Sequence, residues 1–208
     1  MTIIIDMKTI KINDKISYLA ASDHPLSADI GIIEDTGIKW LFDVGNGEDN
    51  ICDLNDNYNV VISHFHLDHL ANISKLRINE LYVSKETYRH LPKELVMTTT
   101  IHIVEDDLYI NGLHIFPIAS SHAKGSLALE VDEEYCFVGD ALYAKYKNYK
   151  ATYNVQLLNA EIKKLKEIKA TKLLVSHKPG LALLKEDAIK ELVALYQSRK
   201  PNQNEIIK

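Results

Sequence analysis

The stretch Ser63-His64-Phe65-His66-Leu67-Asp68-His69 places four side chains that can bind a metal ion within six residues. It lies where a predicted strand gives way to a predicted helix. Because alternate side chains of an extended segment point the same way, His64 and His66 can converge on one ion. Asp68 and His69, at the following turn, would then face a second ion. The alternative is a polar turn whose histidines form hydrogen bonds with water or the backbone. Further candidate ligands elsewhere in the chain are needed to distinguish a metal site from such a turn.

The residues around this stretch predict two halves of similar organisation. Short β-rich runs separated by turn residues come first, and strands alternate with helices after residue 59. The predicted strands are 16–21, 29–34, 39–43, 60–63, 81–84, 101–104, 113–118, 127–131, 135–138 and 172–176. The predicted helices are 68–77, 85–91, a segment with apolar residues at helical spacing from Leu157 to Ile168, and 185–198. Sheets covered on the outside by helices make a four-layer αββα sandwich, an α/β fold.

Composition predicts one domain over residues 1–208, because 46% of the residues are hydrophobic and neither a linker nor an internal repeat interrupts the chain. With 24 basic and 29 acidic residues, nucleic acid is not expected as a partner. The sequence contains neither a secretion signal pattern nor a long apolar run, so we expect no membrane association. Cys52 and Cys136 are too few for a disulfide framework, which favours a cytoplasmic location.

The His-x-His-x-Asp-His pattern resembles the signature of metallo-β-lactamase-fold hydrolases, and the resemblance extends over nearly the whole chain. The other motifs follow in order: Asp43 in Leu41-Phe-Asp-Val-Gly45, His122 in Ser120-Ser-His-Ala-Lys-Gly-Ser126, Asp140 in Val138-Gly-Asp-Ala141, and His177 in Leu174-Val-Ser-His177. Each residue alone has an ordinary structural explanation, but all five motifs in order favour a dinuclear site. The resemblance implies one metal held by His64, His66 and His122, a second held by Asp68, His69 and His177, and Asp140 shared between them. It also implies that Asp43 supports these ligands without binding metal.

The implied ligands are imidazoles and carboxylates without a thiolate, which favours two Zn²⁺ ions, although Mn²⁺ or Fe²⁺ would also accept them. Diiron oxidoreductases of this fold resemble the sequence except that a glutamate stands where this chain has His66, and the chain is too short for their flavin-binding domain. We therefore expect hydrolysis of a small-molecule substrate. Metal-held hydroxide, oriented by Asp68 and Asp140, would attack a small carboxylic ester, lactone or thioester.

Tyr143 is a further catalytic candidate, because Asp140-Ala-Leu-Tyr143 resembles the Asp-Ala-x-Tyr of acyl-homoserine-lactone lactonases, where the tyrosine hydroxyl approaches the substrate carbonyl. The Gly-Gly that commonly follows the histidine motif in lactonases and thioesterases is replaced here by Leu70-Ala-Asn72. Tyrosines recur every three or four residues from Tyr143 to Tyr153, with lysines between them. They are interpreted either as a packing stripe or as an aromatic, basic lid over the site.

Two other functions remain open at the level of sequence. A phosphodiesterase or nuclease can use the same ligand set, but the acidic balance and the lack of an inserted RNA-binding arm argue against it. A metal-binding protein without turnover is the other alternative. Seven ligands around two ions leave coordination positions open for water and substrate, which argues for catalysis.

Overall fold

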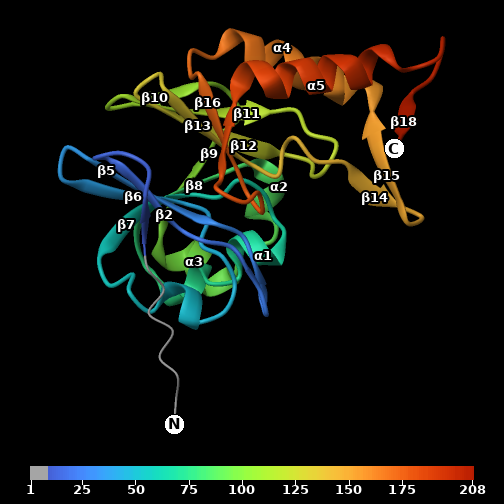
Figure 1. Cartoon of the computed structure of the whole chain (residues 1–208). Helices are drawn as coiled ribbons and strands as arrows, with labels where there is room; N and C mark the ends of the chain where they lie inside the picture. The colour runs from blue at the N-terminus through green and yellow to red at the C-terminus, as the bar shows by residue number, and fades with distance from the viewer. Residues whose placement is uncertain (1–8) are drawn as a thin grey trace.

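Two large β-sheets pack face to face, with helices on the outer face of each, in the computed structural model of the protein, which describes residues 9–208 (Figure 1). The layers run helix, sheet, sheet, helix, as the sequence predicts for an αββα sandwich. None of the helices within the described range is long and apolar enough to cross a membrane. The predicted domain of residues 1–208 also includes residues 1–8, which lie outside that range.

The first large sheet has the strand order β1-β2-β5-β6-β7-β8-β9. Its strands are β1 (Ile10–Lys11), β2 (Ile16–Leu19), β5 (Ile30–Asp35), β6 (Ile38–Phe42), β7 (Asn57–Val61), β8 (Arg77–Val83) and β9 (Thr100–Ile103). Neighbouring strands from β6 to β9 pair in parallel, whereas β1, β2, β5 and β6 pair antiparallel.

The second large sheet has the order β10-β11-β12-β13-β16-β17. Its strands are β10 (Leu108–Ile110), β11 (Leu113–Ile118), β12 (Ser126–Val131), β13 (Tyr135–Gly139), β16 (Lys172–Val175) and β17 (Ala182–Leu184). Only the β13–β16 pair in this sheet is parallel among the described strands. Two smaller sheets are β3 (Ser22–Asp23) with β4 (Leu26–Ser27), and β14 (Lys145–Lys147) with β15 (Lys150–Asn154) and β18 (Glu205–Ile207).

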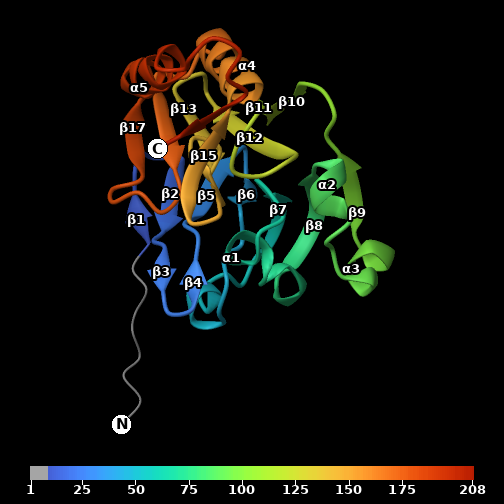
Figure 2. The ribbon, with the colours of Figure 1, turned by 90° about the vertical axis from the view of Figure 1, so that its right-hand side faces the viewer.

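Three apolar layers hold these elements together. The helices on the first sheet are α1 (Leu67–Leu70), α2 (Lys85–Tyr88) and α3 (Lys93–Thr98), and those on the second are α4 (Val155–Glu167) and α5 (Lys185–Gln197), which lie together at the top of Figure 2. Apolar faces of α4 and α5 pack on the second sheet, and residues around α1 to α3 pack on the first. The third layer lies between the sheets, where Phe42 stacks on Phe137 with ring centroids 5.2 Å apart.

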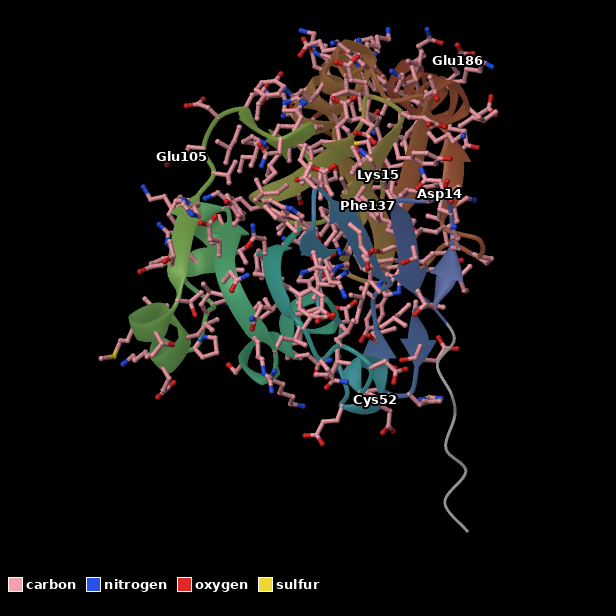
Figure 3. The ribbon with its side chains drawn as sticks, turned by 90° about the vertical axis from the view of Figure 1, so that its left-hand side faces the viewer. Asp14, Lys15, Cys52, Glu105, Phe137 and Glu186 are labelled. Carbon is pink, nitrogen blue, oxygen red and sulfur yellow. The ribbon has the colours of Figure 1, made fainter. Side chains whose placement is uncertain are left out.

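Phe137, labelled in Figure 3, also explains a glycine in the facing strand. A Cβ atom on Gly31 would lie 2.4 Å from Cε1 of Phe137. No side chain fits in that space, so the close contact between the two sheets requires glycine at this position.

The structure differs from the sequence prediction in two places near the histidine motif and the tyrosine run. The helix predicted over 68–77 is only partly present: α1 ends at Leu70, a 3-10 turn occupies Ile73–Lys75, and β8 begins at Arg77. The backbone N–H of Asn72 donates to the carbonyl of Gly45 instead of to Asp68 one turn earlier, so a tertiary contact ends the helix. The tyrosine run forms the β14–β15 hairpin, in which Tyr146 is 77% exposed, so a continuous packing stripe is wrong.

Glu161 on α4 is an ionisable residue inside the apolar layer against the second sheet. Its side chain is fully buried, and neither carboxylate oxygen has a hydrogen-bond partner in the structure. Burial raises the pKa of Glu161 well above its usual value of 4.5. Because the unfolded chain loses this proton at lower pH than the folded chain, Glu161 costs stability as the pH rises above 4.5.

Replacing Glu161 should therefore stabilise the protein. We expect Glu161→Gln to raise the melting temperature at pH 8, with a difference from wild type that shrinks as the pH falls toward 4.5. Glu161→Leu should raise the free energy of unfolding by about 1–3 kcal/mol, because it also removes the unpaired polar atoms. Glu167→Gln, at an exposed position of the same helix, is the control for both in thermal denaturation. A pH-independent effect of Glu161→Gln would contradict this explanation.

Candidate metal centre

The seven residues selected from the sequence lie at one edge of the sandwich, in segments that follow the carboxyl ends of strands. His64, His66, Asp68 and His69 follow β7 and extend into α1, His122 follows β11, Asp140 follows β13, and His177 follows β16. Because these strands run in the same sense within their sheets, their ends bring residues more than a hundred positions apart into contact. The structure thus brings all seven side chains together.

The side chains form two groups, each able to hold a metal ion. In the first, Nδ1 of His66 lies 3.0 Å from Nε2 of His64 and 3.0 Å from Nε2 of His122. In the second, Oδ2 of Asp68 lies 3.1 Å from Nε2 of His177 and 3.5 Å from Nε2 of His69. The ligand atoms within each group lie within 4.8 Å of one another.

Asp140 connects the two groups through a single oxygen. Its Oδ2 lies 3.3 Å from Nε2 of His122 in the first group and 3.4 Å from Nε2 of His69 in the second. Nε2 of His177 is 3.9 Å from the same oxygen. One carboxylate therefore faces both groups, which is the arrangement that a ligand shared by two ions requires.

Asp43 lies beneath the two groups and is fully buried at the end of β6. Its Oδ1 accepts a hydrogen bond from the backbone N–H of Ser63 at 2.7 Å, and its Oδ2 accepts one from the Ser63 hydroxyl at 2.8 Å. Nδ1 of His69 lies 2.7 Å from the same Oδ2. Asp43 thus positions the start of the histidine loop and the ring of His69 without facing the centre itself.

These contacts define the tautomers that we assign to the buried histidines. His69 donates from Nδ1 to Asp43, and His64 donates from Nδ1 to the Ser63 hydroxyl at 3.0 Å. His122 donates from Nδ1 to the carbonyl of Ala144 at 3.3 Å. In all three rings Nε2 is left facing the other ligand atoms, which is how a histidine is held for metal binding.

Backbone geometry at the site is unusual at two of these residues. Asp43 has φ +61° and His177 has φ +60°, values in the left-handed region that non-glycine residues seldom adopt. Gly139, which precedes Asp140, has φ +53°, and a Cβ atom there would lie 2.7 Å from the Ser63 side chain. The ends of β6 and β16 are therefore held in conformations that their own residues do not favour, whereas the end of β13 uses a glycine, which adopts positive φ readily.

Two supporting residues were missed by the sequence analysis. Asp29, at the start of the first half, accepts the backbone N–H of His177 at 2.9 Å and that of Ala21 at 3.0 Å, so it connects the last ligand loop to the first sheet. Buried Asn72 donates from its side chain to the carbonyls of Val44 at 3.1 Å and Gly47 at 2.9 Å. Neither residue lies in a recognisable motif, although Asn72 belongs to the stretch Leu70-Ala-Asn72, which replaces the Gly-Gly found after the histidine motif in lactonases and thioesterases.

The carboxylates of the centre favour a positive charge beside them, and this shows in the pKa values of the neighbouring histidines. Burial lowers the pKa of His64, and the neighbouring His69 and His66 lower it further. Burial also lowers the pKa of His69, but the carboxylates of Asp43 and Asp140 outweigh it and raise that pKa to about 10. His64 is thus neutral and can donate a lone pair, whereas the space beside His69 attracts positive charge.

Tyr143 lies next to the centre, but its hydroxyl is already engaged. The hydroxyl donates to the carbonyl of Ser176 at 2.7 Å, and the ring meets that of His122 edge-on with centroids 6.4 Å apart. Burial, followed by the charge of Asp140, raises the pKa of Tyr143 to about 12. The residue therefore stays protonated and ties the loop before His177 to the segment after Asp140.

Two features of this centre fit metal ions. Nε2 of His69 and Oδ1 of Asp140 are buried without a hydrogen-bond partner, which is costly unless another group binds there. The ligand set is made of neutral imidazoles and carboxylates, the donors that zinc and other first-row metals accept. The residues present therefore fit two ions, with Asp140 between them.

No protein-family model matches the sequence, and no curated protein sequence matches it significantly. Many solved structures do share its fold. A metallo-β-lactamase from Pontibacter korlensis superposes with a TM-score of 0.63 at 16% identity, covering 92% of this chain and 99% of that one. The protein thus has the metallo-β-lactamase fold.

Two further structural neighbours are described as diiron proteins. The flavodiiron protein from Giardia intestinalis superposes with a TM-score of 0.65 at 14% identity, and the match covers 91% of this chain but only 58% of that one. A structure described as the peroxy diiron species of the chemotaxis sensor ODP has a TM-score of 0.65 at 12% identity, with 93% and 95% coverage. The shared fold therefore includes a metallo-β-lactamase as well as diiron proteins, and the reaction has to be argued from the site.

Metal content should show whether both groups are occupied. We expect the protein reconstituted with zinc to hold close to two ions per chain by elemental analysis. Asp43→Ala should weaken metal affinity about 10- to 100-fold, because His69 and Ser63 lose their common partner. Asp35→Ala, at a buried aspartate on the opposite end of the first sheet, is the control. One ion or none in the reconstituted wild type would contradict the assignment of two groups.

Proposed function

We propose that the protein is a metal-dependent hydrolase with a dinuclear zinc centre that cleaves a small carboxylic ester, lactone or thioester. The observation that supports this most directly is Oδ2 of Asp140, which lies within 3.4 Å of a histidine from each group. A purely structural metal site is closed around one ion, whereas two ions sharing a carboxylate leave positions open for water and substrate.

The proposed ligands are His64, His66 and His122 for one ion, Asp68, His69 and His177 for the second, and Asp140 for both. When bound, the ions would supply a nucleophile from water at neutral pH and polarise the substrate oxygen. Three imidazoles in the first group favour zinc over iron, although manganese or iron would also fit this mixture of donors.

The chain itself orients the reactants. Asp68 is half-buried beside the centre, where its carboxylate can accept a hydrogen bond from the attacking water. Asp140 can do the same from the shared position. The Tyr143 hydroxyl donates a hydrogen bond to the backbone carbonyl of Ser176. We therefore propose that the main role of Tyr143 is to position the wall of the site. Donation to a substrate oxygen would require that bond to break.

A cavity of about 370 Å³ adjoins the centre and suits a small substrate. His122, Asp140 and His177 line it on the metal side, and Tyr143, Ala144, Tyr146, Ala151, Tyr153 and Lys208 complete the wall. The tyrosines come from the hairpin of β14 and β15 and its preceding loop, so this segment forms one wall of the cavity, which supports the lid interpretation. Its fully exposed Tyr149 lies outside this lining.

Substitutions should separate ligand binding from positioning. We expect Asp140→Ala to lose at least about 100-fold in kcat/KM, because loss of even a supporting group costs 10- to 100-fold. Tyr143→Phe should lose no more than about tenfold, the equivalent of one hydrogen bond, since the ring remains. Steady-state kinetics with zinc in excess measures both. Equal and small losses would place the active site elsewhere.

The substrate class can be tested directly against its main competitor. Side-by-side assays of p-nitrophenyl acetate, a lactone and bis-p-nitrophenyl phosphate with zinc or manganese should give the highest kcat/KM for one of the carboxylic substrates. The net charge of −5 and the small cavity both disfavour a long polyanion. A higher kcat/KM for the phosphodiester would instead make the protein a phosphodiesterase. Metal binding without cleavage of any of the three would indicate a non-catalytic protein.

A further inference from the structure

A second cavity, of about 340 Å³, adjoins the one beside the candidate metal centre. The two cavities share four lining residues: Tyr143, Tyr153, His177 and Lys208. A group that enters beside His177 can therefore extend from one cavity into the other past the two tyrosine rings. No residue of the histidine motif itself lines the second cavity.

Aliphatic side chains form one part of the lining of the second cavity. Its aliphatic lining comes from the loop after β13, from β16, β17 and α5: Leu142, Val175, Leu183, Ala188, Leu192 and Leu195. Val175, Ala188 and Leu192 are buried, whereas Leu142, Leu183 and Leu195 belong to the same apolar layer but remain partly exposed. The core between α5 and the second sheet is thus incompletely covered on the side that faces the site.

The charged lining residues lie farther out. Glu191 and Lys208 are exposed, and Lys178 is half-buried. Within the described part of the chain, no hydrogen bond or ion pair is seen for the Lys178 side chain. An apolar interior accepts an aliphatic chain, which would cover the partly exposed leucines.

We infer that the second cavity holds the acyl chain of the substrate, so that the enzyme prefers esters or thioesters of aliphatic acids several carbons long over acetyl esters. This inference rests on the proposed hydrolase function. With the acyl chain beside α5, the leaving group lies under the β14–β15 hairpin, where Tyr146 is largely exposed and the released alcohol or thiol can depart to solvent. The Tyr143–Ser176 hydrogen bond holds the ring at the boundary between the two cavities.

Wild-type protein provides the first test. We expect kcat/KM for p-nitrophenyl esters to rise along the series acetate, butyrate, hexanoate and octanoate. Each methylene that leaves water should contribute up to about fourfold, the equivalent of about 0.8 kcal/mol. Measurements stay below the concentration at which the longer esters form micelles. Cleavage of acetate with no gain along the series would overturn the inference and leave the proposed function intact.

Two adjacent leucines of β17 offer a matched pair of variants. Leu183 lines the cavity, whereas Leu184 is 56% exposed and does not. Leu183→Trp should fill the cavity and lower the octanoate-to-acetate ratio of kcat/KM at least tenfold, whereas Leu184→Trp should retain the wild-type ratio. Leu195→Trp, with exposed Ala194→Trp as its control on α5, repeats the test if Leu183→Trp does not fold. Equal ratios for the filled and control variants would contradict the inference.

Binding provides a readout that does not depend on turnover. Calorimetric titration of the metal-free protein should show tighter binding of octanoate than of acetate, a negative heat-capacity change, and loss of the difference in Leu183→Trp. Equal binding of the two acids would count against the cavity. Octanoate binding without cleavage of any ester would overturn the proposed reaction but support the acyl site. If kcat/KM rises with the length of the alcohol in a series of alkyl acetates and not with the length of the acyl chain, the assignment of the cavity to the acyl chain is overturned.

Discussion

The buried carboxylate of Asp43 is the contact on which the arrangement of the candidate metal centre depends. It accepts hydrogen bonds from the backbone and hydroxyl of Ser63 and contacts Nδ1 of His69. A buried carboxylate is costly unless its oxygens are satisfied, and here every partner belongs to the histidine loop. The same contacts therefore stabilise the end of β6, fix where the loop begins and orient a ring toward the centre.

The fold surrounds this contact with elements that bring distant residues to one edge. Parallel pairing of β6 with β7 places Asp43 beside the start of the histidine loop, and parallel pairing of β13 with β16 places Asp140 beside the loop of His177. Asp29 then bonds the loop of His177 to the opposite sheet. The two halves of the chain thus meet at the ligands, and metal binding would stabilise their contact as well as supply chemistry.

The sequence contained enough information for the layers and for the residues that come together in the two groups, because both depend on short, local patterns. Alternating apolar runs identified strands such as β11, whose bounds agree with the prediction, and the motif spacing selected the seven residues that meet in space. Tertiary contacts decided the rest. The predicted helix over 68–77 stops at Leu70, where Asn72 bonds to Gly45, and the tyrosine run forms a hairpin that pairs with β18.

Residues whose roles depend on tertiary contacts alone could not be found in this way. Asp29 and Asn72 lie outside the recognised motifs and gain their roles from partners between 8 and 148 residues away. Glu161 fits a helical pattern as well as any surface glutamate does, yet it lies in the apolar layer without a partner. Burial of one polar position in an amphipathic helix depends on how α4 docks, which periodicity alone does not determine.

The fold by itself does not choose between hydrolysis and redox chemistry, since its structural neighbours include a metallo-β-lactamase and a flavodiiron protein. The choice depends on side chains that the fold leaves free to vary. His66 completes a group of three imidazoles, and the wall opposite the centre is formed by tyrosines and aliphatic side chains. The aliphatic part of this wall can remove an apolar group from water next to Asp140, as the proposed function requires. Under that proposal the metal-binding groups would determine the reaction, and the hairpin and α5, which lie outside the histidine motif, would determine which substrate is accepted.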